Sequence, residues 1–106
     1  MASPISQGAG GQRSTVSVSV DVVRYDPALG VGTFWDEGTR LRVEVWESPE
    51  RTVVISGNAP GLISLARHLL ALTQVDVPDG RHLDFDTYGG WLDEGSSGLR
   101  IELDKR

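Results

Sequence analysis

The chain has 106 residues, of which 39% are hydrophobic and 24% are charged, and it contains no cysteine. This length and composition indicate one globular domain, and the lack of cysteine excludes disulfides, thiolate metal sites and cysteine nucleophiles. The formal net charge of −5 argues against nucleic acid as a partner, because phosphate backbones are bound by clustered Lys and Arg.

The first segment, residues 1–13, is rich in Gly, Ser and Ala and has no periodicity. We therefore expect a disordered tail at 1–13, followed by a single α+β domain over 14–106. The segment lacks the basic leader and the apolar run of a signal peptide. No apolar stretch in the chain approaches the roughly 20 residues that span a bilayer. The sequence thus predicts a cytoplasmic protein with no membrane partner.

Alternation of apolar and polar residues predicts three strands in the first half of the chain. Over 14–22, valine occupies every second position from Val16 onward, which is the clearest strand pattern in the sequence. A second strand is expected at 41–46, and a third at 51–56 after a Ser-Pro-Glu turn. The short connections between these runs favour antiparallel pairing.

The period then changes from two to three or four, which predicts a helix over about 59–74. Asn58 is expected to cap this helix, with Pro60 in the first turn, where its missing N–H costs nothing. Two further strands are expected at 82–86 and 98–103. The order β-β-β-α-β-β predicts an α+β fold in two layers, with one helix packed on a mostly antiparallel sheet of about five strands.

No catalytic constellation is recognisable, and we expect no cofactor and no metal. His68 is expected at the boundary of the apolar face of the helix. His82 and Asp84 lie two residues apart in a predicted strand, so their side chains share a face and could exchange a proton or hold a metal. A small enzyme or metal-binding domain that uses this pair is therefore one alternative, and a surface pair with neither role is the other.

Aromatic and acidic residues are interleaved in the segment DFDTYGGWLDEG, residues 84–95. The Gly-Gly step implies a tight reversal that projects its neighbours outward, and Trp and Tyr beside carboxylates are typical of a protein interface. Alternatively, Trp91 and Leu92 pack beneath the sheet edge as a satellite of the core. The predicted partner-binding residues are Asp84, Asp86, Tyr88, Trp91, Asp93 and Glu94.

Three motifs lie between residues 55 and 103: G-N-x-x-G-L at 57–62, G-x-H-L-D at 80–84 and L-x-x-G-S-x-x-L-x-I at 92–101. In these motifs the chain resembles a family of small immunity proteins of bacterial polymorphic toxin systems, although the second motif lacks one of the family's two histidines. The resemblance covers about half of the chain, and most of the matching residues fit caps, turns and core.

The resemblance implies a non-enzymatic protein that binds a cognate toxin and neutralises it. An acidic domain could cover the basic cleft of a nuclease toxin through charge complementarity, and residues 75–106 carry eight acidic against four basic side chains. A structural or regulatory homodimer that pairs through an open sheet edge is a further alternative. The chain is accordingly expected as a monomer or a weak homodimer.

Overall fold

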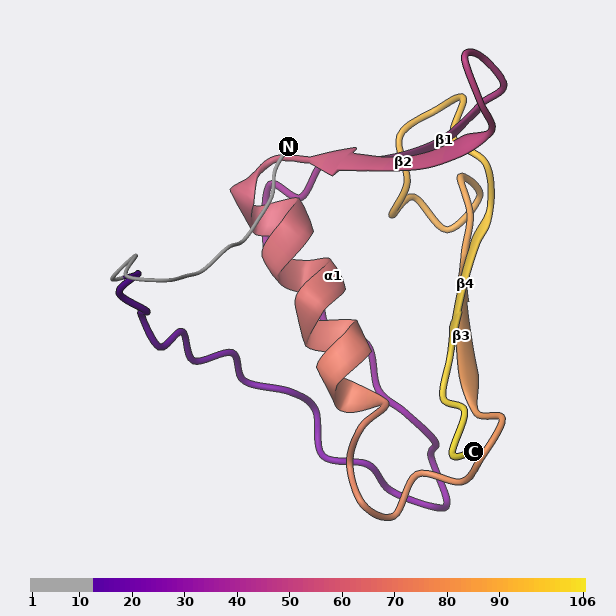
Figure 1. Ribbon diagram of the computed structural model, residues 1–106. Helices are drawn as coiled ribbons and strands as arrows, with labels where there is room; N and C mark the ends of the chain where they lie inside the picture. Colours follow the sequence, from indigo (N-terminus) through magenta and orange to yellow (C-terminus); the bar gives the residue numbers. More distant parts are fainter. Residues whose placement is uncertain (1–12) are drawn as a thin grey trace.

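The computed structural model describes residues 13–106, in which one helix and four strands are found (Figure 1). Strands β1 (Leu41–Trp46) and β2 (Thr52–Gly57) precede helix α1 (Ala59–Ala71), and strands β3 (His82–Phe85) and β4 (Leu99–Glu102) follow it. The α+β class and these five elements agree with the sequence prediction. The tail predicted at 1–13 lies outside the described residues except for Arg13. No helix among residues 13–106 is long and apolar enough to cross a membrane.

The four strands form two separate antiparallel pairs, so the prediction of one sheet of about five strands is wrong. In the first pair Val43 lies opposite Ile55, and in the second Leu83 lies opposite Ile101. Figure 1 shows the β1–β2 hairpin lying across the N-terminal end of α1, while the β3–β4 hairpin runs roughly along the helix direction. Each hairpin turns an apolar face toward the helix. Two small sheets, and not one larger sheet, therefore enclose the core together with α1.

The edge of β1 that faces away from β2 is covered by the loop that joins β3 to β4. The Asp93 N–H donates to the Leu41 carbonyl at 2.7 Å, and the Ser97 N–H donates to the Val43 carbonyl at 2.8 Å. The Val43 N–H in turn donates to Ser96 Oγ at 3.1 Å. These bonds satisfy backbone groups that a third strand would otherwise pair. The loop therefore ties the two hairpins together and leaves no room for another strand on β1.

Residues 14–22 run as an elongated trace in Figure 1 but form no strand, so the strand predicted there is wrong. The side chains of Val16 and Val18 are 84% and 75% exposed. Instead of a backbone ladder, a side chain of α1 holds the segment, because Arg67 Nε donates to the Asp21 carbonyl at 2.8 Å. Alternation shows that a segment can form a strand, but a strand also needs a partner edge, and the edge of β1 is already occupied.

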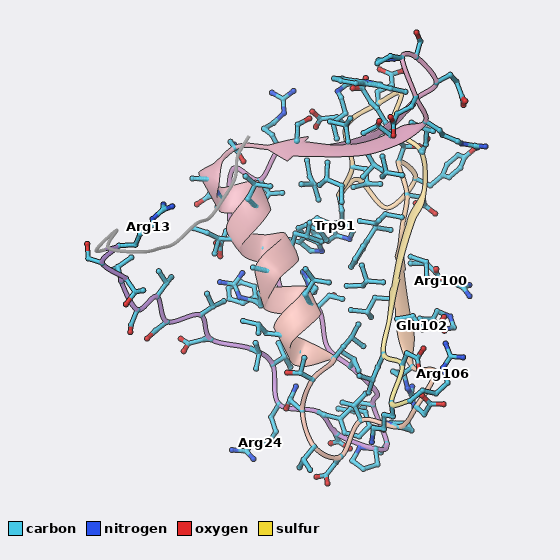
Figure 2. The ribbon with its side chains drawn as sticks, viewed as in Figure 1. Arg13, Arg24, Trp91, Arg100, Glu102 and Arg106 are labelled. Carbon is cyan, nitrogen blue, oxygen red and sulfur yellow. The ribbon has the colours of Figure 1, made fainter. Side chains whose placement is uncertain are left out.

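Charged side chains gather on the outer face of the β3–β4 hairpin. Alternate residues of a strand point to opposite faces, and in β4 the odd positions Leu99 and Ile101 pack against the core. Arg100 and Glu102 point away from α1, as Figure 2 shows. The apolar residues of β4 thus face the core, and its charged residues face outward.

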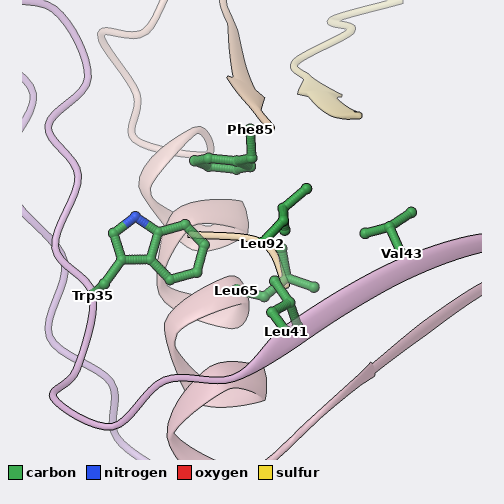
Figure 3. Packing of buried hydrophobic residues seen from close by; sticks show 6 residues of the cluster. All are labelled: Trp35, Leu41, Val43, Leu65, Phe85 and Leu92. Atoms are coloured by element: carbon green, nitrogen blue, oxygen red, sulfur yellow. The ribbon is translucent and has the colours of Figure 1, made fainter. Parts of the chain in front are cut away.

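The core lies between α1 and the inner faces of the two hairpins (Figure 3). Its buried cluster joins residues of β1, α1 and β3 with two residues from outside the regular elements, and Leu99 and Ile101 of β4 pack against it partly buried. Trp35 comes from the segment before β1, and Leu92 comes from the β3–β4 loop. The buried cluster consists of Trp35, Leu41, Val43, Leu65, Phe85 and Leu92.

Helix α1 begins at its predicted cap and is apolar on two opposite sides. The Oδ1 atom of Asn58 accepts the N–H of Gly61 at 2.9 Å, which confirms the cap. One side of the helix, with Leu65 and His68, is buried against this chain. A helix that is apolar all round is usually covered on both sides. The side of α1 opposite Leu65 and His68 is only partly covered and forms an apolar surface. Its four large side chains, each between 42% and 47% exposed, are Leu62, Ile63, Leu69 and Leu70.

Candidate protein-binding loop

The loop between β3 and β4 presents Tyr88 to solvent at the tip of a tight turn. The Tyr88 side chain is 97% exposed. The turn is held by a hydrogen bond from the Gly89 N–H to Asp86 Oδ1 at 2.9 Å. Gly90 follows with φ of +82°, a conformation that side chains other than glycine rarely adopt. The double glycine therefore forms the predicted reversal, and Tyr88 projects from it.

Trp91, in the same loop, belongs partly to the core and partly to the surface. Its ring stacks on the ring of Trp35, with centroids 5.2 Å apart and planes 12° apart. Trp35 is buried and also meets Phe85 edge-on at 5.1 Å. Trp91 itself remains 42% exposed, and it lies between α1 and the β3–β4 hairpin (Figure 2). One side of the ring thus packs on the core, as one of the two interpretations expected, while another side stays open and its role in an interface stays a prediction.

His82 and Asp84 share the outer face of β3, with Nε2 of His82 3.4 Å from Oδ2 of Asp84. Arg100 lies directly across the sheet from Asp84, and its Nε donates to Oδ1 at 2.7 Å. This hydrogen bond is the main reason why the pKa of Asp84 lies below its ordinary value. A carboxylate bound in this way is a poor proton acceptor. Residues 13–106 contain no group of three or more His, Asp or Glu side chains that could hold a metal ion.

The other acidic residues of the predicted site differ in how they are bound. Asp93 accepts two hydrogen bonds from Arg40, at 3.3 Å from Nε and 3.2 Å from Nη2. Asp86 holds the turn beneath Tyr88, and Glu94 is exposed. Within residues 13–106, neither Asp86 nor Glu94 forms an ion pair. The negative field of the loop therefore comes mainly from these two residues, because arginines balance the charges of the other two acids.

His68 is wholly buried, so the prediction of a boundary position is wrong. Its Nε2 accepts the Phe34 N–H at 3.0 Å, and its ring lies 4.5 Å from the ring of Trp35. The pKa of His68 is lowered first by desolvation and also by the positive charge of Arg67. The Ser64 carbonyl acts in the opposite direction, although Nδ1 has no well-aligned hydrogen-bond partner among the described residues. His68 is thus a neutral core residue that holds the segment before β1 on the helix.

Arg67 is a buried residue that sequence reasoning missed. Beyond its bond to the Asp21 carbonyl, its Nη1 donates to the Phe34 carbonyl at 3.2 Å and lies 3.2 Å from Oδ1 of Asp36. The guanidinium carbon lies 4.8 Å from the centre of the Phe34 ring. All of these partners are more than 30 residues earlier in the chain, so no local spacing could have revealed them. Arg67 fixes both segments that precede β1 to the helix.

The motif residues around the start of α1 hold the helix against the chain before β1. The Oδ1 atom of Asn58 accepts the Arg40 N–H at 3.0 Å, and its Nδ2 donates to the Gly38 carbonyl at 2.8 Å. A Cβ atom on Gly61 would lie 2.1 Å from the Arg40 carbonyl oxygen, so no side chain fits there. Together with the bond from β1 to Ser96, these contacts show that the G-N-x-x-G-L and L-x-x-G-S motifs serve the fold. The exposed Tyr88 lies outside both motifs.

The comparison with protein families matches residues 52–104, from β2 through β4, to the model described as Immunity protein 32. This segment makes up half of the chain and contains all three motifs that carry the resemblance noted in the sequence. No curated protein and no solved structure matches the chain. On the strength of that family match, the chain belongs to the Immunity protein 32 family.

Proposed function

We propose that this protein neutralises a cognate bacterial toxin by binding it in the cytoplasm, without any catalysis of its own. Membership of the Immunity protein 32 family, matched over 52–104, is the observation that carries this function. Residues 14–106 act together as the binding domain. Since most of the motif residues are engaged in caps, turns and core contacts, the toxin-binding surface lies mainly on other side chains, with the exposed Asp84 as the one motif residue that it includes.

The loop that carries Tyr88 and Trp91 is the proposed contact surface. Aromatic side chains near the centre of an interface commonly supply much of the binding energy. The ring of Trp91 is held before a partner arrives by its stacking on Trp35, and the turn fixes the backbone at Tyr88. An anchor that is already ordered loses less conformational entropy on binding. Asp86 and Glu94 supply negative charge beside these anchors, and Asp84 and Asp93 complete the proposed contact with their arginine partners.

The charge of the protein favours a basic toxin. The formal net charge is −5, and Asp86 and Glu94 carry charges that no arginine or lysine of the described residues balances. Complementary charge steers two proteins together and suppresses wrong partners, and added salt weakens this effect. A toxin that acts on nucleic acid needs a basic cleft, so such a toxin suits the acidic loop.

We expect the gene of the toxin to lie beside the gene of this protein, and growth of bacteria that express that toxin tests the function directly. Co-expression of this protein should restore growth, and a purified complex should form at low salt and weaken at high salt. Tyr88→Ala and Trp91→Ala should each weaken binding at least about tenfold, which corresponds to about 1.4 kcal/mol. Trp46→Ala is the matched control, because Trp46 is a half-exposed aromatic residue on the other side of the β1–β2 sheet.

The outcomes separate the function from its proposed surface. If co-expression fails to restore growth and no complex forms, the toxin-neutralising function is wrong. If a complex forms but both loop variants bind with unchanged affinity, the function stands and the contact lies elsewhere. If only the Trp46 variant loses affinity, the outer face of β1 is the contact surface.

A further inference from the structure

We propose that two copies of this chain pair as antiparallel strands over residues 13–21, with a two-fold axis through Ser17. The sequence predicts a strand in this segment, but the segment has no strand partner among the described residues. Its backbone groups over 14–20 form no hydrogen bond within residues 13–106. An extended segment with unpaired N–H and C=O groups is a template for another strand.

The segment is held in place at its C-terminal end, while residues 13–19 are exposed. The Oε1 atom of Gln74 accepts a hydrogen bond from the Tyr25 N–H at 2.9 Å, and its Nε2 donates to the Val23 carbonyl at 2.9 Å. With the bond from Arg67 to the Asp21 carbonyl, these contacts anchor the chain from residue 21 onward. In Figure 1 the segment runs along the outside of the molecule, away from all four strands.

The side chains of this segment match a second copy of themselves. Valine occupies positions 16, 18 and 20, while the alternate positions 15, 17 and 19 carry Thr or Ser. In an antiparallel pair, directly opposite residues lie on the same face. With the axis at Ser17, Val16 lies opposite Val18 of the second copy, and Thr15 lies opposite Ser19 of the second copy. One face of the pair is therefore apolar, and the other carries hydroxyls.

Charge complementarity selects this register and favours a second copy over other partners. Arg13 and Asp21 are the only charged residues of the segment. With the axis at Ser17, Arg13 of each copy lies opposite Asp21 of the other, so two pairs of opposite charge form. Opposite charges directly across a strand pair stabilise it. A shift of the axis by one residue places Arg13 opposite Ser19 or Val23, and both charge pairs are lost.

Two single-cysteine variants of the full chain test the register, and the natural chain has no cysteine to interfere. Ser17→Cys places the thiol opposite its own counterpart, with the Cα atoms about 4.5–5.5 Å apart, which suits a disulfide. In Ser19→Cys the two Cα atoms are four residues apart along the strand, or about 13 Å, which is too far for a disulfide. Both positions are exposed and lie on the same face, so random collisions affect them equally.

With oxidised glutathione, Ser17→Cys should form a disulfide-linked dimer at least about tenfold faster than Ser19→Cys, as seen on non-reducing gels. Equal rates, or a faster reaction of Ser19→Cys, would overturn the proposed pairing. Because no toxin is present, this result does not depend on the proposed function. If the segment instead pairs with a strand of the toxin, the chain alone should be monomeric, and pairing should be detected only after toxin is added.

Sedimentation velocity of the variants tests the charge pairs. The natural chain should form a dimer that Val18→Asp and Arg13→Asp each shift toward monomer. The double variant Arg13→Asp/Asp21→Arg should recover the dimer, because it exchanges the two charges and keeps their pairing. Circular dichroism of each variant verifies that the fold is retained. A natural chain that stays monomeric up to about 1 mM would overturn the proposal.

Discussion

The ring of Trp91 lies almost parallel to the ring of Trp35, with the two centroids 5.2 Å apart. This contact joins a surface loop to the centre of the core, since Trp35 also packs on Phe85 and His68. Trp91 therefore contributes to stability through one side of its ring and leaves another side available to a partner. The two roles can be separated by measurement.

Trp91→Ala should lower the free energy of unfolding by about 1–2 kcal/mol and leave the fold intact, because only part of the side chain is buried. Trp35→Ala should lower it by about 3–5 kcal/mol, as expected for a large aromatic side chain removed from a core. Urea denaturation followed by circular dichroism measures both values. If Trp91→Ala unfolds the protein, Trp91 is a core residue and the proposed loop loses its anchor.

Asn58→Ala should lower the free energy of unfolding by about 2–3 kcal/mol. The variant removes the helix cap, worth about 0.5–2 kcal/mol, and leaves the Arg40 N–H and the Gly38 carbonyl without their partner. Asn58→Asp is the control, because it keeps the acceptor for both N–H groups and loses only the donor to Gly38. Thermal denaturation should rank the control between the natural chain and the alanine variant, and equal losses would contradict the capping role.

The stability of the protein should fall as the pH is lowered from 7.5 to 5.5. The pKa of His68 is lowered in the folded state, so the unfolded chain binds more protons once the pH falls through the unfolded value of about 6.5. The expected loss at pH 5.5 is at most about 1.4 kcal/mol. Urea denaturation across this range measures it. His68→Gln keeps an acceptor for the Phe34 N–H but cannot titrate, so an unchanged pH dependence in this variant would assign the effect to another group.

Ser96→Ala should lower the free energy of unfolding by about 1–2 kcal/mol, because the Val43 N–H loses its acceptor at the edge of β1. Ser97→Ala is a matched control, since Ser97 bonds to β1 through its backbone N–H. The control should change stability by less than about 0.5 kcal/mol. Similar losses in both variants, measured by urea denaturation, would show that the Ser96 hydroxyl does not hold β1.

Local signals in the sequence predicted the elements from β1 onward. The alternation in β1 and the Asn58 cap depend only on neighbouring residues, and the structure confirms both. Strand pairing depends on distant residues, and alternation alone could not show that residues 14–22 have no strand partner among residues 13–106. The position of His68 was predicted wrongly because α1 is apolar on two sides. Which side is buried depends on Trp35 and Phe34, more than 30 residues earlier.

The shape of the candidate site was partly predictable in the same way. The turn at Gly89 and Gly90 that exposes Tyr88 is a local feature, and the sequence revealed it. The arginine partners of Asp84 and Asp93 lie 16 and 53 residues away in the chain. Because no spacing reveals such pairs, the acidic run looked more strongly charged in the sequence than it is in the structure. The role of these residues in binding a partner stays a prediction.

The closing of the β1 edge by residues 93–97 has a consequence for the newly synthesised chain. These residues leave the ribosome about 50 positions after β1, and at about 5–20 residues per second this delay is roughly 3–10 s. During that interval the backbone groups of β1 that later bind Asp93, Ser96 and Ser97 have no partner. An open strand edge is prone to associate with other chains. The nascent protein is therefore vulnerable to aggregation through this edge until residues 93–97 have been made and have bound it.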